Sequence, residues 1–174
     1  MAAKKLYGTL SCPATMRALA SMFEHELNFE FIPVDLTGAG DHDVKKGPFL
    51  SLNPFGNGLL FQDGDSLTLF ESRAIMRFIS HQYPKPGKEQ VFIVPKLQGI
   101  AATWIDVEDH QFDPPTSKLV MELVHKPKIG LPTNQAVVAE EEAKLAMVLD
   151  VYEERLTVSP YLGEIYWLDL LGLR

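Results

Sequence analysis

The stretch from Asn53 to Ile75 reads Asn-Pro-Phe-Gly-Asn-Gly-Leu-Leu-Phe-Gln-Asp-Gly-Asp-Ser-Leu-Thr-Leu-Phe-Glu-Ser-Arg-Ala-Ile, and it decides the fold. Its last apolar strand ends at Glu71-Ser72, where a helical pattern begins and where Ser72 is a favourable N-cap. A strand that leads directly into a helix leaves free N–H groups and a positive dipole end at one point, which suits a carboxylate or phosphate. Because Glu71 beside it can hold an ammonium group, the pair predicts a socket for an amino-acid-like ligand end.

The residues around this stretch predict a compact α/β unit of about 80 residues. A polar, glycine-rich loop is expected over 37–47, followed by a short helical turn. Pro13 fits the first turn of a helix, and Pro33 marks an edge strand. The predicted strands are 5–7, 29–34, 59–61 and 67–70, and the predicted helices are 15–27, 49–52 and 72–82.

The second half of the chain is helical in pattern. We expect a first unit over residues 1–83, a Pro-rich linker over 84–92 and an all-helical, incomplete unit over 93–174. Within this last unit, helices are expected at 95–111, 117–124 and 134–156. Asp113-Pro114-Pro115-Thr116 is expected to break or kink the first of them, and 126–132 is expected to be a loop.

Composition excludes several classes of function. The chain has 174 residues, of which 46% are hydrophobic, and its net charge of −7 argues against a nucleic-acid partner. No apolar run approaches the length of a membrane span, and no signal-peptide pattern is evident, so we expect a cytosolic protein without a membrane partner. One cysteine, Cys12, excludes an internal disulfide and a cysteine-based metal cluster. No metal site is expected, because the histidines, which include His81, His110 and His125, lack ligand spacing.

Several segments together resemble the cytosolic glutathione transferases, specifically the plant-type phi class. They are Tyr7-Gly8 with Ala14-Thr15-Met16-Arg17, Asn53-Pro54-Phe55-Gly56, Asp63-Gly64-Asp65, the run from Leu67 to Ile75, Val107-Glu108 with Gln111-Phe112-Asp113-Pro114, and the run from Val148 to Glu153. The resemblance implies a thioredoxin-like glutathione-binding first domain, an all-α second domain and a homodimer. It also implies a hydrophobic pocket between the domains for an electrophilic substrate. Phe112 is the candidate lining residue of that pocket, Met121 is a weaker one, and Trp104 is interpreted as core.

The resemblance also assigns the glutathione-binding residues. Glu71 and Ser72 match the pair that binds the γ-glutamyl end of glutathione, in agreement with the predicted socket. His42, Lys45 and Lys46 match the segment that reaches the glycine carboxylate, and cations on a loop suit that anion. Which of the two lysines makes the contact stays open. Glutathione is a co-substrate here, and no further cofactor is expected.

Asn57-Gly58-Leu59 departs from the family, which has Gln-Val-Pro with a cis proline. That turn presents backbone N–H and C=O groups to the cysteinyl part of glutathione, like an added strand. A cis bond before a non-proline residue costs about 2.5–4 kcal/mol, so we predict a trans bond between Gly58 and Leu59 and a reduced affinity for glutathione.

Cys12 is a second departure, because the family's catalytic serine falls on Cys12 and not on Ser11. A thiol is a weaker hydrogen-bond donor than a hydroxyl. A helix N-terminus favours a thiolate, however, and a thiolate can attack a glutathione mixed disulfide. Either Cys12 faces the glutathione sulfur or Ser11 swings in as the donor. A third interpretation is that Cys12 is a buried, inert residue.

The leading hypothesis is conjugation of reduced glutathione to hydrophobic electrophiles, in detoxification and the stress response. The alternatives are a Cys12-dependent thiol transferase or dehydroascorbate-type reductase, and a weakly active or non-catalytic binder of hydrophobic ligands. The segment after Leu162 also departs from the family pattern, so we expect a shortened form in which apolar helix faces stay uncovered.

Overall fold

The computed structural model describes residues 4–34, 47–64, 66–87 and 92–163. The chain divides into two compact units, Met1–Val91 and Phe92–Arg174. In the described residues, no helix is both long and apolar enough to cross a membrane.

The first unit is built on a four-stranded mixed sheet with the strand order β2-β1-β3-β4. β1 pairs parallel with β2, whereas β3 pairs antiparallel with both β1 and β4. β2 is an edge strand, as Pro33 predicted. The predicted loop over 37–47 lies outside the described residues except for Gly47, which is the first residue of α2. In chain order the elements are β1 (Lys4–Gly8), α1 (Pro13–Glu24), β2 (Glu30–Pro33), α2 (Gly47–Leu52), β3 (Leu60–Asp63), β4 (Leu67–Leu69) and α3 (Ser72–Gln82).

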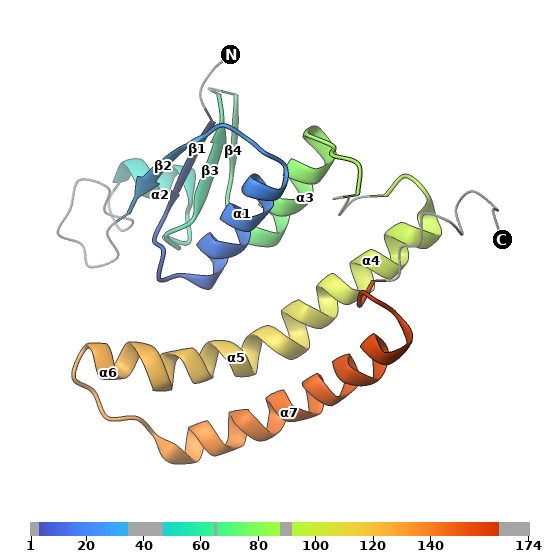
Figure 1. Cartoon of the computed structure of the whole chain (residues 1–174). Coiled ribbons are helices and arrows are strands. Elements are labelled where there is room, and N and C mark those ends of the chain that lie inside the picture. Colours follow the sequence, from blue (N-terminus) through green and yellow to red (C-terminus); the bar gives the residue numbers. More distant parts are fainter. Residues whose placement is uncertain (1–3, 35–46, 65, 88–91, 164–174) are drawn as a thin grey trace. The chain divides into compact units, whose positions relative to one another are not determined.

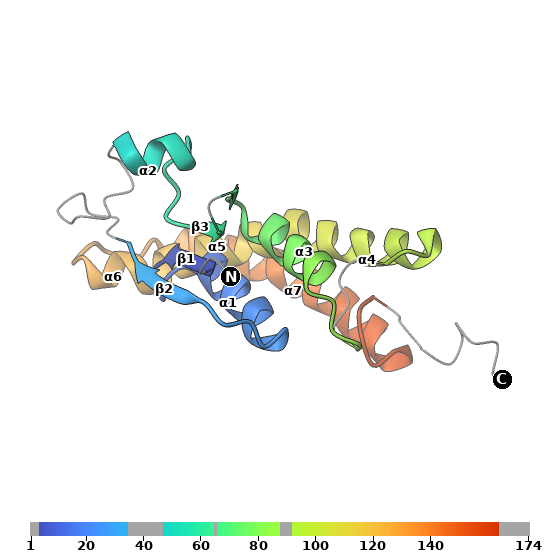
Figure 2. The ribbon, with the colours of Figure 1, turned by 90° about the horizontal axis from the view of Figure 1, so that it is seen from above.

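Apolar side chains form a cluster on each face of this sheet, because successive residues of a strand point to opposite sides. Helices α1 and α3 pack side by side over one face (Figure 1). Helix α2 lies on the other side of the sheet from α1 (Figure 2), where Phe49 packs with Leu60 and Val34. The larger cluster, under α1 and α3, contains Leu6, Ala18, Leu19, Met22, Leu59, Phe61, Ile75 and Ile79.

A polar contact ties the end of α3 back to the sheet. Tyr83, the C-cap residue of α3, donates its hydroxyl to the carboxylate of Asp63 at the end of β3. The ammonium group of Lys4 lies 3.8 Å from the same carboxylate and 4.6 Å from the centre of the tyrosine ring. Burial, together with the Asp63 carboxylate, raises the pKa of Tyr83 to about 12. The helix that begins at Ser72 is therefore anchored at its far end.

The second unit is a helical hairpin. Its first arm comprises α4 (Pro95–Val107), a π-helical segment η1 (Glu108–Phe112), α5 (Asp113–Val120), a second π-helical segment η2 (Met121–His125) and α6 (Lys126–Lys128). This arm runs alongside the long helix α7 (Gln135–Val158) (Figure 1). The predicted all-helical character of this half is confirmed.

The prolines of the first arm do not break the helix, so the break expected at Asp113-Pro114-Pro115-Thr116, as one of two alternatives with a kink, does not occur. A π-helical segment stands just before Pro114, and another stands just before Pro127. A proline ring clashes with the carbonyl one turn earlier in an α-helix, and the wider π turn relieves that clash. The expected loop over 126–132 is likewise helical as far as Lys128.

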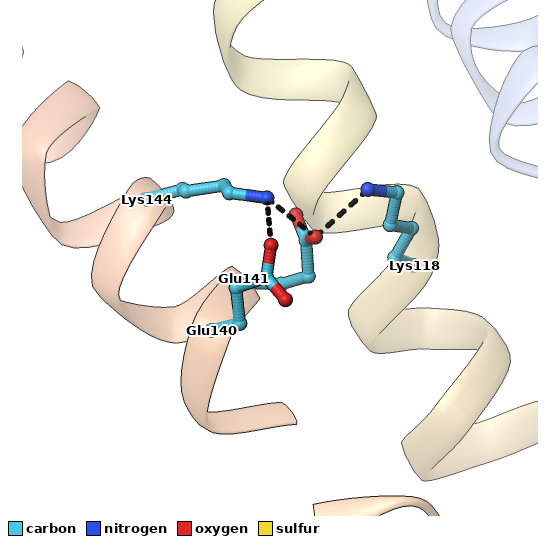
Figure 3. A network of polar contacts seen from close by, with 4 residues as sticks. All are labelled: Lys118, Glu140, Glu141 and Lys144. Atoms are coloured by element: carbon cyan, nitrogen blue, oxygen red, sulfur yellow. Dashed lines mark hydrogen bonds and ion pairs between the residues drawn. The ribbon is translucent and has the colours of Figure 1, made fainter. Parts of the chain in front are cut away.

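A buried carboxylate joins the two arms of the hairpin (Figure 3). Glu141 on α7 is only 2% exposed and accepts hydrogen bonds from Lys118 of α5 at 2.8 Å and from Lys144 at 2.9 Å. Lys144 also donates to Glu140 at 2.6 Å. The hydrogen bonds from Lys118 and Lys144 hold the pKa of Glu141 below its ordinary value. The hairpin therefore depends on an ionised carboxylate.

A second buried carboxylate closes the connection between α6 and α7. Glu122 accepts hydrogen bonds from Lys126 and from the backbone N–H of Asn134 at 2.8 Å. These contacts also lower the pKa of Glu122. Asn134 in turn caps α7, with its side chain accepting from the N–H groups of Ala136 and Val137.

We expect the Glu141→Gln chain to unfold at a lower urea concentration than the parent at pH 7, because a neutral amide cannot pair with two ammonium groups. The pKa of Glu141 is lower in the folded than in the unfolded chain. Its contribution is therefore present above the ordinary value of 4.5 and is lost as pH falls through the folded value. Urea unfolding followed by circular dichroism from pH 7 to 3 measures both effects. Glu142→Gln, an exposed neighbour, is the matched control, and identical behaviour of the two variants would contradict this role.

Candidate functional site

The turn between β1 and α1 carries both predicted catalytic residues. Cys12 is the N-cap residue of α1, with extended backbone (φ −100°, ψ 121°), and its half-buried thiol makes no capping hydrogen bond. Ser11 is exposed, and its hydroxyl pairs with that of Thr9 at 3.1 Å. Cys12 therefore lies directly at the N-terminus of α1, and Ser11 lies one residue outside the helix.

A close backbone approach holds this turn in place. A Cβ atom at Gly8 would lie 2.5 Å from Cγ2 of Thr15, so no larger residue fits there without a shift. Thr15 is completely buried, and its hydroxyl accepts the N–H of Thr9 at 3.3 Å. The end of β1 and the first turn of α1 are thus held together.

The loop before β3 is organised by Asn53, which is 1% exposed. Its amide nitrogen donates to the carbonyls of Asn57 at 2.7 Å and Leu59 at 3.1 Å, and its amide oxygen accepts from the N–H of Phe55 at 3.2 Å. The bond between Gly58 and Leu59 is trans, as predicted. Within the described residues the backbone of Gly58 makes no hydrogen bond, so its N–H and C=O are available to a ligand.

The N-terminus of α3 differs from the prediction. Ser72 is not the N-cap; that position belongs to Glu71, and Ser72 is the first helical residue. The hydroxyl of Ser72, 3% exposed, accepts a hydrogen bond from Nη1 of Arg17 at 3.3 Å. Glu71 is exposed and has φ 73°, a conformation that is rare and strained for a residue with a side chain.

Strand direction brings these three places to one edge of the sheet. β3 is antiparallel to both β1 and β4, so the ends of β1 and β4 and the start of β3 share that edge. Cys12 follows β1, Glu71 and Ser72 follow β4, and Gly58 precedes β3. The hydrogen bond from Arg17 of α1 to Ser72 of α3 joins two of these places directly. The N-termini of α1 and α3 therefore lie close together, where their dipoles favour anions.

Sequence reasoning missed three residues that shape this edge of the sheet. Asn53, Arg17 and Thr9 make the contacts above. In the sequence, Asn53 opens the diagnostic stretch and Arg17 belongs to a segment that matches the family, whereas nothing marks Thr9. His42, Lys45 and Lys46 lie outside the described residues.

The predicted pocket residue Phe112 lies in an aromatic cluster of the helical unit. Its ring stacks on Tyr152 at 6.0 Å, and Trp104, interpreted as core, meets Tyr152 edge-on at the same distance. Burial, and secondarily the carboxylate of Glu108, raises the pKa of Tyr152. Phe112 is half-buried in this cluster, while Met121 is half exposed to solvent.

A groove of about 460 Å³ runs between the first arm and α7, and Phe112 does not line it. Among the described residues, no group of three His, Cys, Asp or Glu side chains is arranged to hold a metal ion. The residues lining the groove are Val107, His110, Gln111, Pro114, Pro115, Lys118, Glu141, Lys144, Met147, Val148, Val151 and Tyr152.

Comparison with known proteins decides the family. Residues 2–81 match the family model of the glutathione S-transferase N-terminal domain. A glutathione S-transferase of Hyoscyamus muticus is 50% identical over 159 residues, which cover 91% of this chain and 73% of the relative. This chain belongs to the glutathione S-transferase family.

Other members of the glutathione S-transferase family agree in sequence and structure. Glutathione S-transferase F7 of Arabidopsis thaliana is 48% identical over 163 residues, covering 94% of this chain and 76% of the relative. The crystal structure of transferase F7 from Populus trichocarpa superposes with a TM-score of 0.85 at 33% identity, over 94% of this chain and 76% of that one. Transferase I from maize, solved with an atrazine glutathione conjugate, gives 0.84 at 32% identity, over 95% of this chain and 75% of that one. The predicted thioredoxin-like first domain, helical second domain and plant-type phi class are confirmed.

Replacing Asn53 with alanine tests its part in this transferase fold. The change leaves the carbonyls of Asn57 and Leu59 without their partner, and Leu59 is buried. We expect the free energy of unfolding to fall by about 1–3 kcal/mol, the usual cost of unpaired buried polar groups. Urea unfolding monitored by circular dichroism measures it, with the exposed Asn28→Ala as control. A loss no larger than that of the control would remove Asn53 from this role.

Proposed function

We propose that this transferase binds glutathione across the edge formed by Cys12, Gly58 and Ser72, and conjugates the glutathione sulfur to hydrophobic electrophiles. The observation that carries the proposal is the convergence of the three places at one sheet edge. The tripeptide needs a partner for its γ-glutamyl end, its central backbone and its sulfur. Ser72, Gly58 and Cys12 would supply these partners in that order. In conjugation, a bond forms between the sulfur and the electrophilic carbon. If that carbon carries a halide, the halide leaves with the bonding electrons, and the thiol proton passes to solvent.

The γ-glutamyl end fits the N-terminus of α3. Its carboxylate would accept from the free N–H groups of the first turn and from the hydroxyl of Ser72. Because Arg17 donates to the oxygen of Ser72, the hydroxyl hydrogen is left for a ligand acceptor. Glu71, exposed beside it, would pair with the ammonium group. His42 and Lys45 or Lys46 are proposed for the glycine carboxylate.

The central backbone of glutathione would pair with the N–H and C=O groups of Gly58. The N–H and C=O of Gly58 are available, whereas the carbonyls of Asn57 and Leu59 are occupied by Asn53. Added-strand pairing would therefore centre on Gly58, which is followed by a trans bond. This supports a lower affinity than a proline-bearing turn would give.

Thiol transfer is the second candidate function, and the position of Cys12 favours it. The thiol lies at the N-terminus of α1 and makes no capping bond. As a thiolate it would attack the glutathione sulfur of a mixed disulfide, breaking the S–S bond and releasing the other thiolate, which takes a proton from solvent. A second glutathione would then attack the Cys12–glutathione disulfide, releasing oxidised glutathione and restoring Cys12. Dehydroascorbate-type reduction would share only the last step, in which a second glutathione releases oxidised glutathione from Cys12, and two glutathione molecules would supply the two electrons and two protons.

Membership of the family also suggests an oligomeric state, a contact for the electrophile, a location and a biological role. We infer a homodimer, supported by exposed apolar side chains such as Phe55, 73% exposed, and Met147 on α7, 63% exposed. Phe112 is proposed to contact the electrophile, since the residue is only half-buried. A cytosolic location, which suits a lone cysteine, and a role in detoxification and stress are proposed with it.

Two conservative changes test the γ-glutamyl contacts. Ser72→Ala and Glu71→Gln each remove one charge-assisted hydrogen bond, worth about 1.5–3 kcal/mol, so we expect KM for glutathione to rise roughly 10- to 100-fold. Steady-state conjugation of a chlorodinitrobenzene-type substrate measures KM. Ser66→Ala and Glu30→Gln, both exposed, are the matched controls. If the Ser72 and Glu71 variants keep the parent KM, the γ-glutamyl end binds elsewhere.

Replacing Cys12 with serine separates the two chemistries. A hydroxyl is a stronger donor than a thiol and cannot form a disulfide, so we expect conjugation to rise several-fold and reduction of a glutathione mixed disulfide to disappear. Both activities are to be assayed on one preparation. Persistence of disulfide reduction in the variant would exclude Cys12 as the nucleophile. If the parent shows neither activity, both enzyme readings fail, and a non-catalytic binder of hydrophobic ligands remains.

A further inference from the structure

Thr9 makes three hydrogen bonds in and around the turn that carries Ser11 and Cys12, the two candidates for facing the glutathione sulfur. Its N–H donates to Oγ1 of the buried Thr15 at 3.3 Å, which anchors it to α1. Its carbonyl accepts the N–H of Cys12 at 3.0 Å. Its hydroxyl pairs with the hydroxyl of Ser11 at 3.1 Å. One residue thus holds the backbone of Cys12 and the side chain of Ser11 at the same time.

The side chains of Ser11 and Cys12 differ in their hydrogen bonding. The hydroxyl of Ser11 is occupied by Thr9, in an exposed pair one residue outside the helix. The thiol of Cys12 makes no hydrogen bond within the described residues and stands at the N-cap of α1. Either hydroxyl can be the donor in this pair, and where Ser11 donates to Thr9 it would have to give up that partner before donating to a sulfur at the helix N-terminus. The pair with Thr9 therefore competes with that donation.

We propose that Thr9 is a positioning residue that keeps the Ser11 hydroxyl turned aside and so leaves Cys12 as the group that faces the glutathione sulfur. The inference rests on the proposed function and deepens it, because it says what decides between the two candidates. Through this pair Thr9 sets the balance between conjugation, which a hydroxyl donor promotes, and thiol transfer, which needs the cysteine.

Thr9→Val tests the inference, because valine keeps the branched shape and both backbone hydrogen bonds but removes the hydroxyl. The loss of one hydrogen bond of this kind should raise the ratio of conjugation to disulfide reduction roughly 2- to 10-fold. Thr9→Ser keeps the hydroxyl and should retain the parent ratio. The double variant Thr9→Val with Ser11→Ala should lose the gain, because the freed donor is absent.

The control is Thr103→Val, which removes a hydroxyl of α4 that bonds to the carbonyl of Gly99 at 2.9 Å. A ratio unchanged in Thr9→Val, or a gain that survives Ser11→Ala, overturns the inference. If the parent has neither activity, the proposed function fails, and crystal structures of the variants still decide about Thr9. Ser11 should keep its place in Thr9→Ser and turn towards the N-terminus of α1 in Thr9→Val. An unmoved Ser11 in the valine variant contradicts the inference.

Discussion

The direction of β3 is the constraint on which the rest of the first unit depends. Because β3 runs antiparallel between β1 and β4, these two strands point the same way and end at the same edge. Each leads within a few residues into a helix, so two helix N-termini lie together there. At that edge, the carboxylates of a ligand meet the positive N-terminal ends of α1 and α3, and its extended backbone meets the backbone at the start of β3. A thioredoxin-like sheet therefore supplies a peptide-binding edge before any side chain is considered.

A few hydrogen bonds turn this edge into a defined site. Asn53 holds the carbonyls on both sides of Gly58, and Arg17 ties α1 to the first residue of α3. Buried polar groups of this kind are costly when unpaired, so they fix one arrangement of the loops. The strained backbone of Glu71 fits the same picture, because strain persists only where the surroundings over-determine a residue.

Much of this could be predicted from the sequence, and the exceptions have physical causes. Strands, helices and the sheet-edge position of Pro33 follow from local pattern and turn chemistry. The N-cap assignment of Ser72 was wrong by one residue, because the carbonyl of Glu71 accepts the N–H of Ile75 and the helix therefore begins at Ser72. The contact from Arg17 to Ser72 spans 55 positions, which local rules cannot include. The proline segment at Asp113 did not break the helix, because a π-helical segment stands before it and packing on α7 supports it. The trans bond at Leu59 was predictable, because it depends on covalent preference alone.

The central claim is that glutathione lies across this edge with its sulfur against Cys12. A crystal structure of the protein with bound glutathione tests it most directly. The account predicts the γ-glutamyl carboxylate at the N-terminus of α3 beside Ser72, and the glutathione sulfur nearer to Sγ of Cys12 than to Oγ of Ser11. Glutathione bound away from the N-terminus of α3, or its sulfur in contact with Ser11 instead, would contradict the account.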